Sequence, residues 1–545
     1  MSRTPVVEGA PLDDRRDRPI RRLPPVLTIA ALCVAVALSL PLVYLALRAA
    51  EATPASWDLI LRDRTVWLTV RTLVLAAAVT AASVAIGVTA AWLVMRTDLP
   101  RRRFWAVAFA LPLVFPSYVG AFALLSALGP RGLLQQLVET PFGTDRLPDI
   151  SGFPGAFLAL TLFTYPYVFL TVAAGIRGLD PALEEAARTL GQSRWRVFLR
   201  VTLPMLRPSI VAGGLLVALY TLHDFGAVSL MRYQTFTQAI FLQYRAAFDR
   251  TPAAILSLIL VALALGVLAL EQRARGRARY YRAGTGAAPK LRPVALGRWR
   301  ILAVVFAASV TLAALVLPVT VLAYWLARGL TAGTPFNLTM GAAANALLVS
   351  AGGALVALAA ALPVALLAGR FPGTLSRGVE RVSYVGYALP GIVVALSLVF
   401  FAANYAPGIY QSLPLVIGAY VVLFLPQVSE PLRGAILQVN PSLEDAGRTL
   451  GLSRARVLRR VVLPLVARPA LAGVALVFLT AMKELPATLL LRPTGFETLA
   501  TRIWTGASAG LYSRAAAPAL LLIAICSVPL FLLAGRIEIR EVRPE

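Results

Sequence analysis

DPALEEAARTLGQSRWRVFLRVTLP, residues 180–204, and NPSLEDAGRTLGLSRARVLRRVVLP, residues 440–464, are two copies of one stretch. From Pro181 and Pro441 onward the copies lie 260 residues apart and agree at 16 of 24 positions. Random pairing at ordinary residue frequencies gives about two matches. The chain is therefore an internal duplication. A buried core helix would not carry so many charges, so the stretch is expected outside the apolar core.

Each copy has the signals of two short amphipathic helices around a glycine. Asp180 and Asn440 suit the N-cap, and Pro181 and Pro441 suit the first helical position, where a missing N–H costs nothing. An apolar face recurs at helical spacing before the glycine, and a second run follows it. We expect Leu-Pro to end this second run before the next apolar segment. A membrane-surface helix with a solvated arginine face is the alternative, but it does not explain a matched pair.

The spacing of these residues resembles the cytoplasmic loop of permease subunits in ABC importers. That pattern is Glu-Ala-Ala, three residues, Gly, nine residues, an aliphatic residue, one residue, Leu-Pro, and the second copy departs from it only in conservative ways, with Asp for Glu and Gly for Ala. The resemblance implies a coupling helix that docks in a cleft of a separate ATPase subunit. The implied coupling residues are Glu184, Glu185, Ala186, Ala187, Gly191 and Pro204, with Glu444, Asp445, Ala446, Gly447, Gly451 and Pro464.

Length and composition predict an all-α polytopic membrane protein. The chain has 545 residues, a mean hydropathy of +0.75 and 14% charged residues. A helix of about 20 apolar residues spans a bilayer. Twelve segments qualify: Val26–Leu47, Trp67–Met95, Phe104–Leu128, Gly155–Ala174, Met205–Leu222, Pro252–Leu270, Ile301–Ala327, Met340–Leu367, Val382–Ala403, Leu413–Leu432, Ala467–Met482 and Ala516–Leu533.

The basic residues orient these spans. With the N-terminus inside, cytoplasmic segments hold 38 of the 52 Lys and Arg residues, as the positive-inside rule requires. The net charge of +26 is thus topogenic, and nucleic acid is not expected as a partner. Both termini are expected in the cytoplasm, and the resemblance implies a bacterial plasma (inner) membrane.

The spans divide the chain into two parallel repeats. We expect a cytoplasmic tail at 1–25, a first half at 26–270, a flexible linker at 271–300, a second half at 301–535 and a tail at 536–545. An even number of spans per half makes both halves enter from the cytoplasm, with a solute pathway between them. Prolines at Pro112 and Pro390 are expected to kink the third and ninth spans, as packing kinks or as hinges.

Four ionisable residues lie at matching positions where the fifth and eleventh spans end: His223 and Asp224, and Lys483 and Glu484. Charged groups at the edge of a span are costly unless they face water, a partner or a pathway. We expect them near the outer mouth, lining the entry or meeting a docking protein. Snorkelling to the interface is the alternative.

The chain carries no motif that converts energy. Its two lysines, Lys290 and Lys483, exclude a phosphate-binding loop, and one histidine with two distant cysteines excludes a His/Cys zinc cluster. The chain is therefore expected to be no enzyme and to hold no cofactor. The resemblance implies a homodimeric ATPase pair that uses ATP and Mg²⁺ at the cytoplasmic face, and a soluble solute-binding protein at the outer face.

Two further classes remain open as alternatives. An ion-gradient-driven secondary transporter would need ionisable residues deep in the bundle, whereas the middle of the spans is almost uniformly apolar. A membrane-embedded enzyme or channel is the other.

The substrate is suggested only by resemblance. Residues 483–504, KELPATLLLRPTGFETLATRIW, and the fusion of two halves look like ferric-iron importer permeases, and residues 223–227 and 235–240 resemble the matching region. Fused permeases for thiamine, and more distantly for polyamines or phosphonates, are also similar. The resemblance implies that selectivity resides chiefly in the solute-binding protein.

Overall fold

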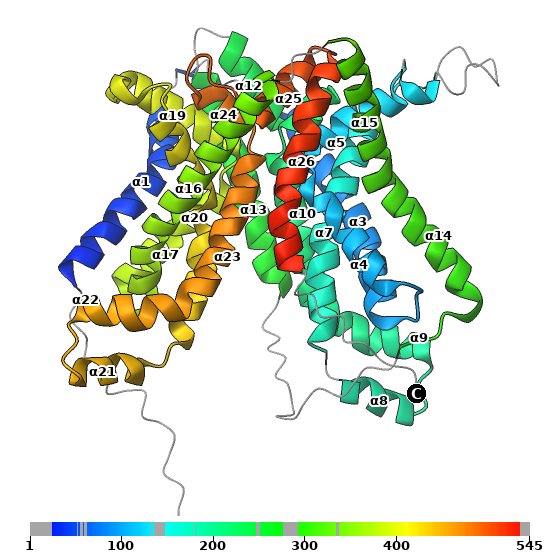
Figure 1. Ribbon diagram of the computed structural model, residues 1–545, viewed down its shortest axis with the longest axis horizontal. Coiled ribbons are helices and arrows are strands. Elements are labelled where there is room, and N and C mark those ends of the chain that lie inside the picture. The colour runs from blue at the N-terminus through cyan, green and yellow to red at the C-terminus, as the bar shows by residue number, and fades with distance from the viewer. Residues whose placement is uncertain are drawn as a thin grey trace, which may run out of the picture.

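In the computed structural model, helices connected by short turns make up the described part of the chain, apart from one isolated bridge between Thr97 and Val294. The described part covers residues 24–51, 53, 54, 58, 63–130, 132–135, 148–179, 181–246, 251–275, 293–333 and 337–534. Two bundles of long helices lie side by side and diverge toward one end of the molecule, where α8 and α21 lie (Figure 1). Both predicted tails fall almost wholly outside the described residues.

Thirteen elements of the first half lie within the described residues. They are α1 (Pro25–Ala50), α3 (Asp63–Arg96), α4 (Arg102–Ala110), the 3-10 helix η1 (Leu111–Val114), α5 (Ser117–Leu128), α7 (Phe153–Arg177), α8 (Pro181–Thr189), α9 (Arg194–Val197), the π-helix η2 (Phe198–Thr202), α10 (Leu203–His223), α11 (Gly226–Leu230), α12 (Phe236–Ala246) and α13 (Thr251–Arg275).

The second half repeats this order. Its elements are η3 (Gly297–Trp299), α14 (Arg300–Thr311), the π-helix η4 (Leu312–Val316), α15 (Leu317–Thr331), α16 (Asn337–Arg370), α17 (Thr374–Ser383), α18 (Val385–Ala388), α19 (Gly391–Tyr405), η5 (Pro407–Ile409), α20 (Leu413–Gln438), α21 (Pro441–Thr449), α22 (Arg454–Val457), the π-helix η6 (Leu458–Val462), α23 (Leu463–Met482), α24 (Pro486–Leu491), α25 (Leu499–Ser508) and α26 (Tyr512–Ala534).

Ten of the twelve predicted spans are continuous helices. Within the described residues, ten helices are long and apolar enough to cross a membrane, or eleven if one bent pair is a single span. The third and ninth spans, expected as kinked helices, are instead each divided into separate helices. The third consists of two pieces whose axes differ by 98°, and the ninth contains α19, which has 15 residues.

The breaks have a common cause in two prolines. Pro116 precedes α5 with φ −62° and ψ 143°, and Pro390 precedes α19 with φ −61° and ψ 143°. A residue before proline is pushed out of the helical region, and Phe115 and Leu389 are both extended. Pro390 thus interrupts its span more strongly than the expected kink, and its counterpart in the first half is Pro116. Pro112 lies inside η1.

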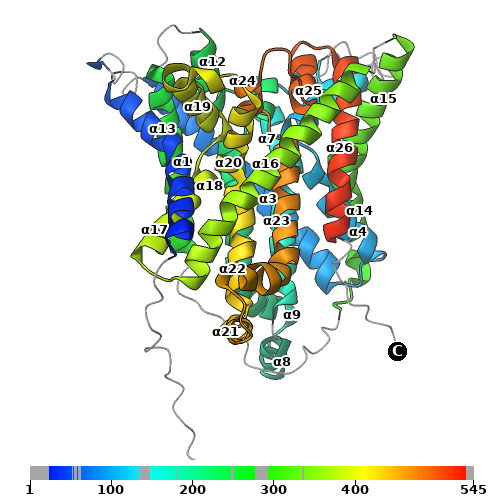
Figure 2. The same ribbon diagram turned by 60° about the vertical axis from the view of Figure 1, so that its left-hand side comes forward.

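The first helix of each half packs on the other half. α1 contacts α16, α17 and α19, and α15 contacts α5. Figures 1 and 2 show α1 along the outside of the second bundle, and Figure 1 shows α14 and α15 along the outside of the first. Tyr44 of α1 lies 6.2 Å from Phe400 between ring centroids, and the Trp325 indole N–H donates to the Ser126 hydroxyl. Each spatial bundle therefore combines residues of both sequence halves.

Both ends of the expected linker, 271–300, have defined structure. α13 continues to Arg275, and residues 276–292 lie outside the described part. The end that precedes α14 is bound to the segment after α3. The Val294 N–H donates to the Arg96 carbonyl at 2.7 Å, and the Leu296 N–H donates to Asp98 at 2.8 Å.

Candidate functional site

The two repeated loops lie at the same end of the molecule. α8 and α21 project from the diverging ends of the two bundles, one on each (Figure 1). Both sit beyond the ends of the long helices, outside the apolar core, so the placement fits a surface that an external partner reaches twice.

Local capping explains where each loop helix begins and ends. The Asn440 side chain accepts a hydrogen bond from the Ser442 N–H at 3.0 Å, as expected for an N-cap; Asp180 lies outside the described residues. At the other end Gly191 has φ +77° and Gly451 has φ +82°. A glycine in the left-handed region is the usual end of a helix in a Schellman motif.

The hydrogen bonds of that motif are present in both loops. The Gly191 N–H donates to Arg188 at 2.9 Å and the Gln192 N–H donates to Ala187 at 3.2 Å. The second loop repeats these bonds at 3.0 and 3.1 Å, from Gly451 to Arg448 and from Leu452 to Gly447. The expected turn at the glycine is thus confirmed.

Each loop helix turns one side inward and its apolar stripe outward. In α8, Glu184 and Ala187 are buried, whereas Leu183, Ala186 and Leu190 are exposed, Leu190 by 81%. In α21 the same pattern holds: Gly447 is buried, and Leu443, Ala446 and Leu450 are exposed, Leu450 by 83%. Glu185 and Asp445 are also exposed, and Glu444 is half-buried.

An ion pair joins each loop helix to the second span of its half, and the pair of the first half is buried. Arg96, the last residue of α3, pairs with Glu184, and their side chains are 3% and 8% exposed. The Thr202 hydroxyl also donates to Glu184, at 2.9 Å. In the second half Arg370, the last residue of α16, lies 2.6 Å from Glu444, with exposures of 11% and 17%.

The predicted stop at Leu-Pro was wrong. Pro204 and Pro464 lie in the first turn of α10 and α23, and each follows a π-helical turn, η2 or η6, instead of a break. Proline clashes with the carbonyl four residues earlier, and the wider π turn relieves this contact. The helix is consequently continuous over Phe198–His223 and Ala455–Met482.

The four ionisable residues at the ends of α10 and α23 are largely held inside the protein. Asp224 Oδ1 accepts from the Ala227 N–H at 2.9 Å, and the Ser117 hydroxyl donates to Asp224 Oδ2. Glu484 Oε1 accepts from the Ala487 N–H at 3.0 Å. Each carboxylate therefore caps the short helix after it. Asp224 is buried, so it does not snorkel.

These carboxylates also meet the breaks in the third and ninth spans. Ser117, the partner of Asp224, begins α5, and a Cβ on Gly391, which begins α19, would lie 2.5 Å from Glu484 Oε1. Lys483 donates to the Leu113 carbonyl of the other half at 3.0 Å. His223 Nε2 makes no hydrogen bond within the described residues. Both carboxylates therefore stabilise the turn that follows α10 or α23. Their proposed position on a solute pathway stays a prediction.

Comparison with known proteins identifies the chain. The family model for the inner membrane component of binding-protein-dependent transport systems matches residues 83–280 and 361–540. The chain belongs to this family. The two matched ranges contain one loop each, so the duplication seen in the sequence is a duplication of the whole permease unit. Membership makes the chain a transport subunit of the membrane and not an enzyme.

The relatives include fused and single permeases. An Fe(3+)-transport system permease protein of Haemophilus influenzae is 35% identical over 518 residues, 94% of this chain and 98% of the relative. A molybdenum transport system permease protein of Escherichia coli is 31% identical over 196 residues, 35% of this chain and 84% of the relative. A sulfate transport system permease protein of Synechocystis is 30% identical over 202 residues, 36% of this chain and 72% of the relative.

Sequence reasoning missed the arginines that hold the loops. Arg96 and Arg370 count among the basic residues at the inner ends of the spans, which the positive-inside rule already explains, and no motif marks Thr202. A signal was present, since each arginine occupies the last position of the second span of its half. The partner, however, lies 88 residues away in the first pair, and no local pattern indicates a contact of that range.

Proposed function

We propose that this permease forms the translocation pathway of an ATP-driven importer, with ATP and Mg²⁺ used by a separate pair of identical ATPase subunits. α8 and α21 are the docking helices in this proposal. The observation that carries it is the repeated pattern of burial: Leu190 and Leu450 are exposed at matched positions on two helices that are otherwise well anchored. Exposed apolar groups of this kind mark protein interaction sites.

The anchoring explains how such docking would act on the pathway. Each docking helix is joined by an ion pair to α3 or α16, and its glycine turn leads into the long helix that ends beside Asp224 or Glu484. A partner that pulls the two docking helices together would therefore tilt α10 and α23 as rigid bodies. A direction of transport follows only if the ATPase states bind the two permease states with different affinity.

We propose ferric iron as the solute. The support is the similarity to the Haemophilus influenzae Fe(3+)-transport permease, which extends over nearly the whole of both chains. The molybdenum and sulfate relatives match only 35% and 36% of the chain. Selection of the solute is assigned to a soluble binding protein at the end opposite α8 and α21.

The orientation is part of the same proposal. In this proposal the end that carries α8 and α21 faces the cytoplasm, because both loops and the segments 96–103 and 370–381 beside them are rich in arginine, and both termini are expected on the same side. The membrane is the bacterial inner membrane.

Reconstitution tests the proposal. The permease, its ATPase and its binding protein are placed in proteoliposomes, and uptake of radiolabelled ferric iron is measured with and without ATP. We expect uptake that requires ATP and the binding protein and that excess thiamine, phosphonate or molybdate does not reduce. Uptake of thiamine in place of iron would overturn the substrate, and uptake driven by an ion gradient without ATP would overturn the whole proposal.

A further inference from the structure

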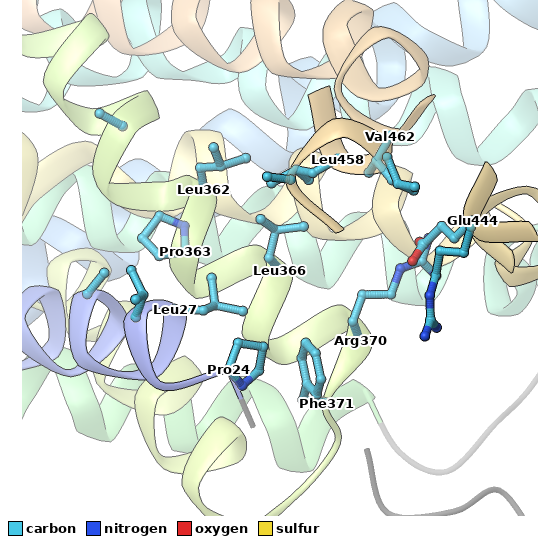
Figure 3. Close-up of a pocket in the computed structure, with 16 residues that line it drawn as sticks. Pro24, Leu27, Leu362, Pro363, Leu366, Arg370, Phe371, Glu444, Leu458 and Val462 are labelled. Atoms are coloured by element: carbon cyan, nitrogen blue, oxygen red, sulfur yellow. The ribbon is translucent and has the colours of Figure 1, made fainter. Parts of the chain in front are cut away.

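One cavity at the loop end of the second bundle is lined by residues from three parts of the chain. It measures about 620 Å³ and lies between the start of α1, the end of α16 and the second loop. Pockets that hold small molecules range over roughly 300–1,000 Å³. In Figure 3, Leu27, Leu362 and Pro363 lie on one side of this cavity, and Arg370 and Glu444 lie together on the other.

The cavity exists because the two repeats differ at matched positions. Arg96 corresponds to Arg370, so Trp92 corresponds to Leu366, and Phe198 corresponds to Leu458 by the offset of the loops. In the first half Trp92 and Phe198 pack edge to face with ring centroids 4.6 Å apart. In the second half the two leucines line the cavity. The replacement of two aromatic rings by smaller side chains leaves this volume open.

The chemistry of the walls is that of an amphipathic ligand. Ten aliphatic residues and two prolines form most of the wall. The charged side chains of Arg370, Glu444 and Arg448 are also among the lining residues. Two guanidinium groups against one carboxylate leave a positive charge. Arg448 has only a distant partner, since its nearest carboxylate oxygen, on Asp445, is 3.6 Å away at the exposed surface. Arg370 Nε makes no hydrogen bond within the described residues.

The position of the cavity selects the kind of ligand. It lies where two membrane-spanning helices, α1 and α16, begin and end, with apolar walls on the side of the spans and arginines on the side of the loop. A soluble solute would need several polar groups in the wall to replace its water. A lipid has an apolar chain, which would lie against the apolar walls, and a charged head group, which would lie against the arginines. Basic pockets between membrane helices are known to bind anionic head groups.

We propose that this cavity binds one anionic phospholipid, with its phosphate at Arg448 and Arg370 and an acyl chain along Leu362, Leu366 and Leu458. The lipid would then contact α21 through Glu444 and Arg448, so that membrane composition acts on one of the two loops and not on the other. In the first half the packed rings of Trp92 and Phe198 occupy the corresponding positions, so the proposal concerns the second loop alone.

Lipid retention by the purified chain tests this directly, without ATPase, binding protein or solute. The chain is reconstituted in nanodiscs of equal phosphatidylglycerol and phosphatidylcholine, extracted in detergent and analysed by native mass spectrometry. We expect one retained phosphatidylglycerol in the wild type. The variant Leu366→Trp/Leu458→Phe, which copies the first half, should lower that occupancy at least tenfold. Leu355→Trp, at an exposed leucine of the same helix, is the matched control and should retain the lipid.

A second variant addresses the head group and does not depend on repacking the cavity. Arg448→Gln removes a charge from an exposed position, so folding is not expected to suffer. Its preference for phosphatidylglycerol over phosphatidylcholine should fall at least fivefold. Equal retention of phosphatidylglycerol by the wild type and the filled variant, or equal retention of both lipids by the wild type, would overturn the proposal.

Discussion

Gly191 and Gly451 end the loop helices because each adopts a left-handed backbone conformation. Gly191 and Gly451 have φ of +77° and +82°, and a Cβ at either position would meet nothing within 4 Å. The left-handed region costs other residues roughly 1–2 kcal/mol. A side chain would thus change the path of the chain without disturbing any neighbour.

We predict that Gly191→Val/Gly451→Val uncouples the transporter. The altered turns should displace Leu190 and Leu450, so that solute transport per ATP hydrolysed falls at least tenfold while the protein still inserts. Uptake and ATPase rates in proteoliposomes measure this ratio. Gly434→Val is the control, because Gly434 lies inside α20, also has open space around it, and has no positive φ. Unchanged coupling in the double variant would argue strongly against α8 and α21 as couplers.

The buried ion pair of the first loop gives a prediction about stability. Arg96→Ala should lower the free energy of unfolding by about 3–5 kcal/mol, because it leaves the Glu184 carboxylate buried with an uncompensated charge. Arg370→Ala should cost less, since Arg370 and Glu444 are the more exposed pair. Denaturant unfolding of the permease in detergent measures the difference.

The control for the ion pair is a change of both partners. Arg96→Met/Glu184→Leu removes both charges and should recover most of the loss, as apolar replacements of buried pairs do. A double variant as unstable as Arg96→Ala would show that packing of the arginine, not its charge, holds the loop.

How far the sequence predicted this site depends on the range of each contact. The glycine turns and the Asn440 cap rest on residues a few positions apart, and these features were confirmed. The ion pairs join residues 88 and 74 positions apart, so they became visible only with the fold. The capping role of Asp224 was also missed, because its partner Ser117 belongs to another span.

At the scale of elements, the exposed apolar stripes of α8 and α21 carry the proposed docking. We predict that Leu190→Glu/Leu450→Glu abolishes binding of the ATPase subunits, because each substitution would place a charge in an apolar contact. The permease itself should keep its thermal stability, since both leucines are more than four-fifths exposed. Co-purification with a tagged ATPase measures the binding.

Leu511→Glu provides a matched control for the stripes. Leu511 is also exposed, but it precedes α26 at the end of the molecule opposite the loops (Figure 1). Its variant should bind the ATPase like the wild type. Retained binding in the Leu190/Leu450 variant would place the ATPase elsewhere.

The elements also show why sequence rules failed at two places. Leu-Pro is a common helix stop, yet here the π turns η2 and η6 absorb the proline and keep each helix continuous. Conversely, the third and ninth spans were predicted as kinked helices, with the first kink at Pro112, but Pro116 and Pro390 divide them into separate helices. Hydropathy indicates that a segment lies in the membrane, and it does not indicate whether neighbouring helices support a break there.

At the scale of the whole molecule, the first helix of each sequence half packs against the helices of the other half. The Asn404 amide donates to the Tyr44 hydroxyl at 3.4 Å, and the Phe225 and Trp504 rings, with centroids 5.0 Å apart, join the halves near the end opposite the loops. The two halves are therefore held together by direct contacts between their helices, in addition to the covalent connection. The contacts of α1 and α15 are sufficient to expect specific assembly without a covalent link.

We predict that a chain cut within residues 276–292 still assembles when both fragments are expressed together. A tag on the second fragment should recover the first in equal amount after detergent extraction, because the exchanged helices bury apolar surface that neither fragment covers alone. A first fragment that begins after α1 should be recovered in at least fivefold lower yield, since it lacks Tyr44 and its contacts with Phe400 and Asn404. If removal of α1 made no difference to recovery, the exchange of helices would be incidental, and the central contacts such as Phe225 with Trp504 would hold the halves together.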